Sequence, residues 1–407
     1  MTETHDKELG SALRELDVPE HHPDFEESLE HRLRRRSPRR TWALAAAAAL
    51  AAAAIVALVM PRGSDVASAA QVREAVADAF ASAGRVSGVF VNREGGGENR
   101  WSFVLDSSGS FRIKGLGKNN PTDLAYDSKT NVESWSDLGL FVRRTGLAPG
   151  WPDSSAAGWV VQRGLGSVVA ALAASPDADV DEVEYAGRAA WQLHTPTGNP
   201  GEERLITVDK ETGIPVRDAR LRNGRPAGEW RIEQLQVDDK PAPTRFTLQR
   251  KPDQQPTAYD MGFRRASLRE IAEMVGYELP VPAWVPDGYE LDESAVARSS
   301  RPTGDEQHQN PPSRNVVSLR YRRGLDELVI TTRSTGPGPS RWSDPVMGSS
   351  MRANPPERIN VIGNPAWLVI DPNSVPHIWA IQGPHVVTIA GNLDRAELLR
   401  VAESLPR

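Results

Sequence analysis

The side chains that most often carry out chemistry are few and scattered along this chain. It has no cysteine, and its 8 histidines form neither an H-x-x-x-H nor an H-E-x-x-H spacing. No G-x-S-x-G motif and no phosphate-binding glycine loop is present, and acidic pairs such as Asp181-Glu182 are typical of a solvated surface. The sequence therefore predicts no catalytic residue, no metal site, no cofactor and no enzymatic activity. A catalytic triad drawn from distant positions would escape such a search.

The amino-acid composition excludes several further classes of protein. Without cysteine the chain forms no disulfide, no thiol nucleophile and no cysteine zinc site. A net charge of -6 on 407 residues is mild and does not indicate a nucleic-acid partner. The length is enough for a membrane segment and two domains of ordinary size.

One apolar stretch, Trp42 to Met60, dominates the N-terminal part of the sequence. It carries no charge over about 20 residues, the length with which a helix crosses about 30 Å of hydrocarbon. Arginines are concentrated between positions 32 and 40, whereas Arg62 is the only basic residue shortly after the stretch. Because basic residues gather on the cytoplasmic side, we expect residues 1–41 inside the cell, a transmembrane helix at 42–60 and the bulk of the chain outside.

Two other interpretations of this stretch stay open. Ala67-Ser68-Ala69 fits the small-x-small pattern of a signal-peptide cleavage site, although the charged and apolar regions before it are longer than those of usual signal peptides. A buried alanine-rich helix would fit the apolar composition, but it would leave the arginine block unexplained.

The segment before the anchor contains two predicted short amphipathic helices. Their apolar stripes are formed by Leu9, Leu13 and Leu16 in the first helix and by Phe25, Leu29 and Leu33 in the second. Helices of about a dozen residues are marginal on their own. We expect them either to fold on a cytoplasmic partner, with Leu9, Leu13, Leu16, Phe25 and Leu29 in contact, or to form a tail whose arginines lie on anionic lipid head groups.

Beyond the anchor, the pattern predicts two α+β domains, at residues 65–250 and 259–407. In the first, a capping box at Ser68 opens a helix that ends at Gly84, and an antiparallel meander of strands follows. The phrase from Asp209 to Pro215 is a predicted turn, and the proline-rich residues 250–257 are a predicted linker. In the second domain we expect a helix after Ser267, a hairpin around residues 323–324 and a closing helix from residue 394.

The order of elements in residues 71–249 resembles the lipoprotein-carrier fold. A leading helix, a long meander, a W-x-L strand and a D-x-x-T-G-x-P turn are similar to the LolA-type carriers and the RseB/MucB-type regulators of envelope stress. That resemblance implies an antiparallel half-barrel with helices, whose concave side holds acyl chains. The candidate ligand-binding residues are Trp101, Phe103, Phe111, Trp135, Trp191 and Trp230. The same aromatic residues would equally fill an ordinary core.

The second domain resembles C-terminal domains of bacterial membrane-anchored anti-sigma and related envelope proteins. The phrases that carry this resemblance are A-W-V-P-D-G-Y-E-L and W-x-I-x-G-x-H-V-V-T-I-A-G, followed by the closing helix. We therefore expect a single-pass sensor that binds a ligand or partner outside, regulates envelope stress signalling and contacts a sigma factor in the cytoplasm. The alternative is a membrane-tethered carrier of lipid or lipoprotein.

Overall fold

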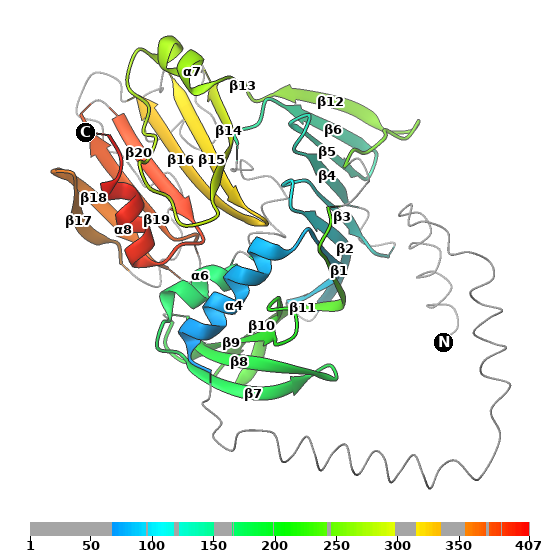
Figure 1. Cartoon of the computed structure of the whole chain (residues 1–407). Helices are drawn as coiled ribbons and strands as arrows, with labels where there is room; N and C mark the ends of the chain where they lie inside the picture. The colour runs from blue at the N-terminus through cyan, green and yellow to red at the C-terminus, as the bar shows by residue number, and fades with distance from the viewer. Residues whose placement is uncertain are drawn as a thin grey trace, which may run out of the picture. The chain divides into compact units, whose positions relative to one another are not determined.

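The computed structural model describes residues 67–94, 97–117, 122–149, 165, 167–197, 199–241, 246–297, 315–334, 355–371, 374–383 and 385–406. All of them belong to one compact unit, Val66–Arg407. Its described elements are mostly strands with a few short helices, which confirms the α+β class (Figure 1).

Neither the predicted anchor nor the cytoplasmic helices fall within these ranges. The stretch Trp42–Met60 and the candidate contact residues Leu9, Leu13, Leu16, Phe25 and Leu29 lie outside the described residues. Among the helices that are described, none combines the length and the apolar character needed to cross a bilayer.

Twelve of the described strands form one sheet, the first sheet, in the order β12-β6-β5-β4-β3-β2-β1-β11-β10-β9-β8-β7. Neighbouring strands are antiparallel except for the parallel pair of β12 and β6. The bounds are β1 Arg85–Glu94, β2 Gly97–Asp106, β3 Phe111–Gly115, β4 Asp123–Asp127, β5 Val132–Asp137, β6 Leu140–Thr145, β7 Asp179–Tyr185, β8 Arg188–Pro196, β9 Glu202–Asp209, β10 Pro215–Arg222, β11 Arg225–Asp238 and β12 Gln255–Asp260.

Two helices, α4 (Ala69–Ser82) and α6 (Ser167–Ala174), contribute to the core of this sheet. The predicted capping box is present, since Ser68 accepts from the backbone N–H of Gln71 and the Gln71 side chain accepts from Ser68. Val72, Val76 and Phe80, at helical spacing, are buried. The meander expected from the sequence and the helix that leads into it are therefore confirmed.

The structure differs from the sequence-based expectation at both sides of the predicted linker. The antiparallel meander expected in the domain at residues 65–250 does not extend to its end, because residues 246–250 form no strand. Residues 255–257, expected in the linker, begin β12, which pairs with β6. Proline at position 256 is compatible with this pairing because β12 is the edge strand of the sheet, where a missing N–H is tolerated.

Eight further described strands form the second sheet, in the antiparallel order β13-β14-β15-β16-β20-β19-β18-β17. Helices α7 and α8 contribute Ile271, Leu398 and Val401 to its aliphatic core. The bounds are β13 Phe263–Arg265, α7 Leu268–Val275, β14 Glu290–Ala297, β15 Val316–Arg323, β16 Asp326–Ser334, β17 Glu357–Val361, β18 Asn364–Val369, β19 His377–Gln382, β20 His385–Gly391 and α8 Arg395–Glu403.

Candidate functional site

Helix α4 is contacted by one turn from each of the two sheets and by helix α8. On the side of the first sheet it meets the turn between β9 and β10, residues 209–213. Gly213 has a φ of 67°, and a Cβ atom there would lie 2.6 Å from the carbonyl oxygen of Ala75. Only glycine combines this left-handed backbone with so close an approach to a helix. The turn is therefore packed directly on the backbone of α4.

The carboxylate of Asp209 holds this turn in shape. It accepts hydrogen bonds from the Thr212 backbone N–H and hydroxyl, each at 2.8 Å, and from the Arg188 guanidinium at 2.5 and 3.0 Å. Burial by itself raises the pKa of Asp209, but these donors outweigh it and keep the pKa below its ordinary value. The D-x-x-T-G-x-P phrase is thus a rigid turn rather than a catalytic motif.

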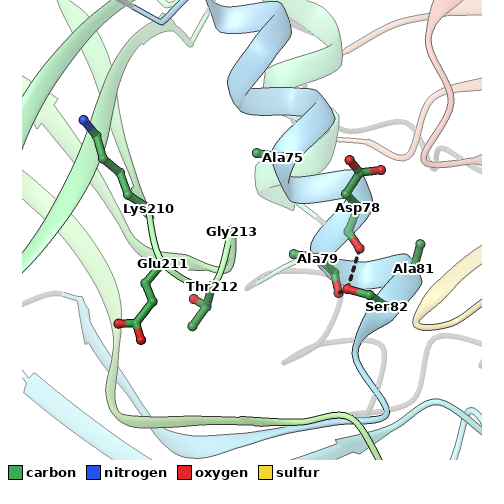
Figure 2. A pocket seen from close by; sticks show the side chains of 9 residues that line it. All are labelled: Ala75, Asp78, Ala79, Ala81, Ser82, Lys210, Glu211, Thr212 and Gly213. Atoms are coloured by element: carbon green, nitrogen blue, oxygen red, sulfur yellow. Dashed lines mark hydrogen bonds between the residues drawn. The ribbon is translucent and has the colours of Figure 1, made fainter. Parts of the chain in front are cut away.

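A shallow depression of about 520 Å³ lies between the turn and the C-terminal half of α4 (Figure 2). Its lining residues are Ala75, Asp78, Ala79, Ala81, Ser82, Lys210, Glu211, Thr212 and Gly213. Lys210 is paired with Glu182 at 2.6 Å, and Glu211 with Arg188 at 3.0 Å. The Ser82 hydroxyl donates to the backbone oxygen of Asp78 at 2.8 Å. These partners hold the polar groups in structural contacts, so the depression suits surface binding better than acid–base chemistry.

The second sheet reaches α4 through the turn between β15 and β16, residues 323–326. The backbone N–H of Leu325 donates to the carbonyl oxygen of Phe80 at 2.7 Å. Gly324, with a φ of 60°, lies so close to the carbonyl oxygens of Phe80 and Ala81 that a Cβ atom there would overlap them. One turn from each sheet therefore packs a left-handed glycine against α4.

A second buried carboxylate supports this turn. Asp326 is 1% exposed and accepts from Arg323 and from the Asn392 amide, each at 3.1 Å. Burial raises the pKa of Asp326 to about 6, because these donors offset only part of the desolvation. The turn therefore carries a carboxyl group that titrates close to neutral pH.

An ion pair links α4 to the closing helix of the second sheet. Arg73 Nη2 lies 2.8 Å from Asp394 Oδ2, and Arg73 Nη1 lies 3.8 Å from Glu397 Oε2. Both carboxylates belong to the capping box of α8, where Asp394 accepts from the Glu397 backbone N–H at 2.8 Å. About one third of each of these side chains is exposed, so the link is weak and open to change.

The aromatic residues predicted to bind a ligand lie in or beside the core of the first sheet. Trp101, Phe103, Phe111 and Trp230 are between 5% and 9% exposed, and the ring centroids of Phe90 and Trp230 are 5.4 Å apart. Trp135 and Trp191 are only partly buried and pack against this core. The first four thus have the packing of core residues, and a ligand-binding role for any of the six stays a prediction.

A buried ion pair lies beside this aromatic core. Arg204 and Asp218 form a buried bidentate pair, with Nη2 and Oδ2 2.6 Å apart, and the Trp230 indole N–H donates to Asp218 at 3.1 Å. A buried pair of this kind needs all of its hydrogen bonds to offset desolvation. It fixes the position of Trp230 within the sheet.

Several contacts of α4 could not be found by sequence reasoning. The turns at Gly213 and Gly324 are visible as glycine-containing phrases, but nothing in the sequence indicates that both meet one helix. Arg73 and Asp394 are 321 positions apart, so no local pattern connects them. Within the ranges that the structure describes, no group of three or more His, Asp or Glu side chains is arranged to hold a metal ion.

Several solved structures match the chain, and MucB structures are among them. No protein-family model matches it, and no curated protein matches it. MucB in complex with MucA(peri) is 18% identical, and the match covers 83% of this chain and 98% of that chain with a TM-score of 0.29. MucB alone is 17% identical, over 83% and 97% of the two chains, with a TM-score of 0.30. The Pseudomonas aeruginosa MucA/MucB complex is 20% identical, over 83% and 98%, with a TM-score of 0.26.

TM-scores this low assign no role to any residue of this chain. The structures found nevertheless include the RseB/MucB type, which is the type of protein that the sequence resembles.

Proposed function

We propose that this protein is a single-pass, membrane-tethered sensor of the cell envelope, with its folded unit outside and its N-terminal segment in the cytoplasm. The observation that carries the proposal is the position of α4. This helix begins at Ala69, nine positions after the end of the predicted anchor at Met60, and it contacts turns from both sheets and helix α8. A rearrangement of the two sheets would therefore act on the element nearest to the anchor.

The contacts of α4 differ in strength, which suits a signalling role. The two glycine turns fit tightly on the helix backbone, whereas the Arg73 ion pair is partly exposed. An exposed pair of this kind contributes at most about 1 kcal/mol. Binding of an apolar ligand or a protein partner outside could open this contact without unfolding either sheet.

The partners are proposed from the resemblance of the sequence to envelope-stress regulators. In this proposal the cytoplasmic residues Leu9, Leu13, Leu16, Phe25 and Leu29 contact a sigma factor, and a lipid or lipoprotein is the ligand outside. Trp135 and Trp191 are the aromatic candidates that are only partly buried, so they would meet such a ligand first. The protein performs no catalysis in this proposal.

The experiment compares Arg73→Ala with Arg93→Ala in the full chain expressed in its membrane. Arg93 forms an exposed pair with Glu98 at 3.0 Å and serves as the matched control. We expect Arg73→Ala to change sigma-dependent transcription several-fold while thermal stability stays within about 1 kcal/mol of wild type. Arg93→Ala should leave transcription unchanged.

Further variants separate a sensor from a tethered carrier. Replacing both Leu13 and Phe25 with Asp should abolish co-purification of a sigma factor with the full chain. A carrier predicts the opposite result: neither these replacements nor Arg73→Ala would change transcription, whereas lipid transfer between vesicles would depend on the outer domain alone. That outcome would remove the sensing proposal.

A further inference from the structure

Two arginines of β15 are buried where the second sheet meets the first. Arg320 is 3% exposed and Arg322 is 9% exposed. They are two positions apart on one strand, so both point to the same side of the second sheet. In the turn between β2 and β3 of the first sheet, Gly109 lies so close to Arg322 that a Cβ atom on it would be 2.6 Å from Nη1. The Arg322 guanidinium is therefore enclosed between a strand of one sheet and a turn of the other.

Arg320 is surrounded by negative groups. Its Nη2 lies 2.6 Å from Asp292 Oδ2 and 2.9 Å from Glu293 Oε2. Burial by itself lowers the pKa of Arg320, but the charges of Glu327 and of these carboxylates outweigh it and raise the pKa above its ordinary value. The charge of Arg320 is thus well compensated in the folded protein.

Arg322 is buried to a similar extent but is poorly paired. Its Nη2 donates to the carbonyl oxygen of Gly324 at 3.0 Å, whereas the buried Nε has no hydrogen-bond partner among the described residues. Glu327 Oε1 is 3.7 Å from this Nε and 3.9 Å from Arg320 Nη1, so the two arginines share one carboxylate. Burial lowers the pKa of Arg322, the like charge of Arg320 adds to the fall, and the nearby carboxylates offset only part of it. The fold therefore encloses a charge that its surroundings do not fully compensate.

This poorly paired charge lies beside the C-terminal end of α4. Gly324, which accepts from Arg322, packs on carbonyl oxygens of the helix. The backbone N–H of Ser107, in the β2–β3 turn, donates at 2.9 Å to the carbonyl oxygen of Gly84, two positions after the helix. Both the β2–β3 turn and the β15–β16 turn are thus tied to the same end of α4, and their separation would act on this helix.

We propose that Arg322 is a destabilising charge built into the contact between the β2–β3 and β15–β16 turns, and that it keeps this contact poised to open. The inference rests on the proposed function, since it identifies the contact whose opening would be passed on to α4. An enclosed guanidinium with few partners has lost its water without full compensation, which raises the free energy of the closed state. When the turns separate, water solvates Arg322 again, whereas Arg320 gains nothing because carboxylates already pair with it.

Hydrogen exchange in the full chain measures how often this contact opens. The amides to follow are those of Leu325 and Ser107, whose hydrogen bonds tie the two turns to the end of α4. Arg322→Met removes the charge and keeps the length of the side chain, and Glu327 stays solvated because it is 31% exposed. We expect both amides to exchange roughly tenfold more slowly, since an apolar side chain in place of a poorly compensated buried charge stabilises the closed state.

Arg320→Met is the matched control, because it removes a buried arginine from the same strand and the same side of the sheet. It leaves Asp292 and the buried Glu293 with less positive charge near them, so the two amides should exchange roughly tenfold faster. Arg322→Lys keeps the enclosed charge and should not slow the exchange.

A second neutral variant, Arg322→Gln, keeps an amide group that can donate to Gly324. Slower exchange in both neutral variants supports the proposal, and so does slower exchange in Arg322→Gln alone, because Gly324 then needs a donor but not a charge. Unchanged or faster exchange in both neutral variants overturns the proposal. Slower exchange in Arg322→Met alone, or in Arg322→Lys as well, also overturns it, because the gain would then come from packing and not from removal of the charge.

Sigma-dependent transcription separates this inference from the proposed function. Slower exchange in the neutral Arg322 variants with unchanged transcription would leave the contact poised to open and contradict the sensing proposal. A change of transcription in Arg73→Ala, with unchanged or faster exchange in the Arg322 variants, would support sensing and remove this inference.

Discussion

The two turns that meet α4 share a plan and differ in their electrostatics. Each places a left-handed glycine, Gly213 or Gly324, against carbonyl oxygens of the helix. Each is supported by an aspartate that is only 1% exposed, Asp209 in the first sheet and Asp326 in the second. Yet the pKa of Asp209 is lowered, whereas that of Asp326 is raised to about 6.

The difference shows that burial does not by itself decide the charge of a carboxyl group. Desolvation raises the pKa in both turns and is the largest effect in each. Asp209 accepts from Thr212 twice and from Arg188 twice, and these bonds reverse the effect. Asp326 has Arg323 and Asn392 as donors, and the neighbouring Glu327 opposes its ionisation. Donors to the ionised form therefore set the sign of the shift.

The largest effect is expected from replacing the left-handed glycine that both turns place against α4. Gly213→Ala and Gly324→Ala each place a Cβ atom into a helix carbonyl group and force alanine into a left-handed conformation. We expect each variant to lose about 2–4 kcal/mol in the free energy of unfolding, measured with denaturant. Gly187→Ala and Gly363→Ala are the controls, because they have φ values of 78° and 80° and no atom within 4 Å of the added Cβ. Equal losses in all four variants would show that the contact with α4 contributes nothing.

The next largest effect is the pH dependence of stability that the raised pKa of Asp326 causes. Because its pKa in the folded protein is above the ordinary value, folding favours the protonated form, and wild-type stability falls as pH rises from about 4 through about 6. Asp326→Asn mimics the protonated form and should remove this part of the decline. The difference in unfolding free energy between variant and wild type should therefore grow by roughly 2–3 kcal/mol from pH 4 to pH 7. Parallel pH profiles would contradict the raised pKa.

The smallest effect is expected at Asp209, with the opposite sign. Its lowered pKa means that its contribution to stability is present above the ordinary carboxyl pKa and is lost as pH falls through the lower value in the folded protein. Asp209→Asn should destabilise the protein by about 1–2 kcal/mol at pH 7, because an amide accepts more weakly from Arg188 and Thr212. Thermal unfolding should show this loss shrinking in acid. A loss that grows in acid would contradict the assignment.

Local sequence patterns were sufficient to predict the elements whose hydrogen bonds and packing involve residues a few positions apart. The capping boxes at Ser68 and Ser267 and the turn with Gly213 all satisfy backbone groups within a few positions. Alternating apolar residues likewise placed β2, the strand that bears both Trp101 and Phe103. The pattern failed at β12, because that strand is selected by its backbone pairing with β6 and not by the apolar alternation of its own side chains.

The site around α4 was decided by tertiary structure alone. Arg73 and Asp394 meet across 321 positions, and Gly213 and Gly324 approach the same helix from different sheets. The opposite pKa shifts of Asp209 and Asp326 depend on which donors the fold brings to two equally buried carboxylates. Within the described residues, the sequence by itself determined where the helices and most strands form, since hydrogen bonding and apolar periodicity act over a few residues. Contacts between distant segments depend on packing, and only the folded chain contains that information.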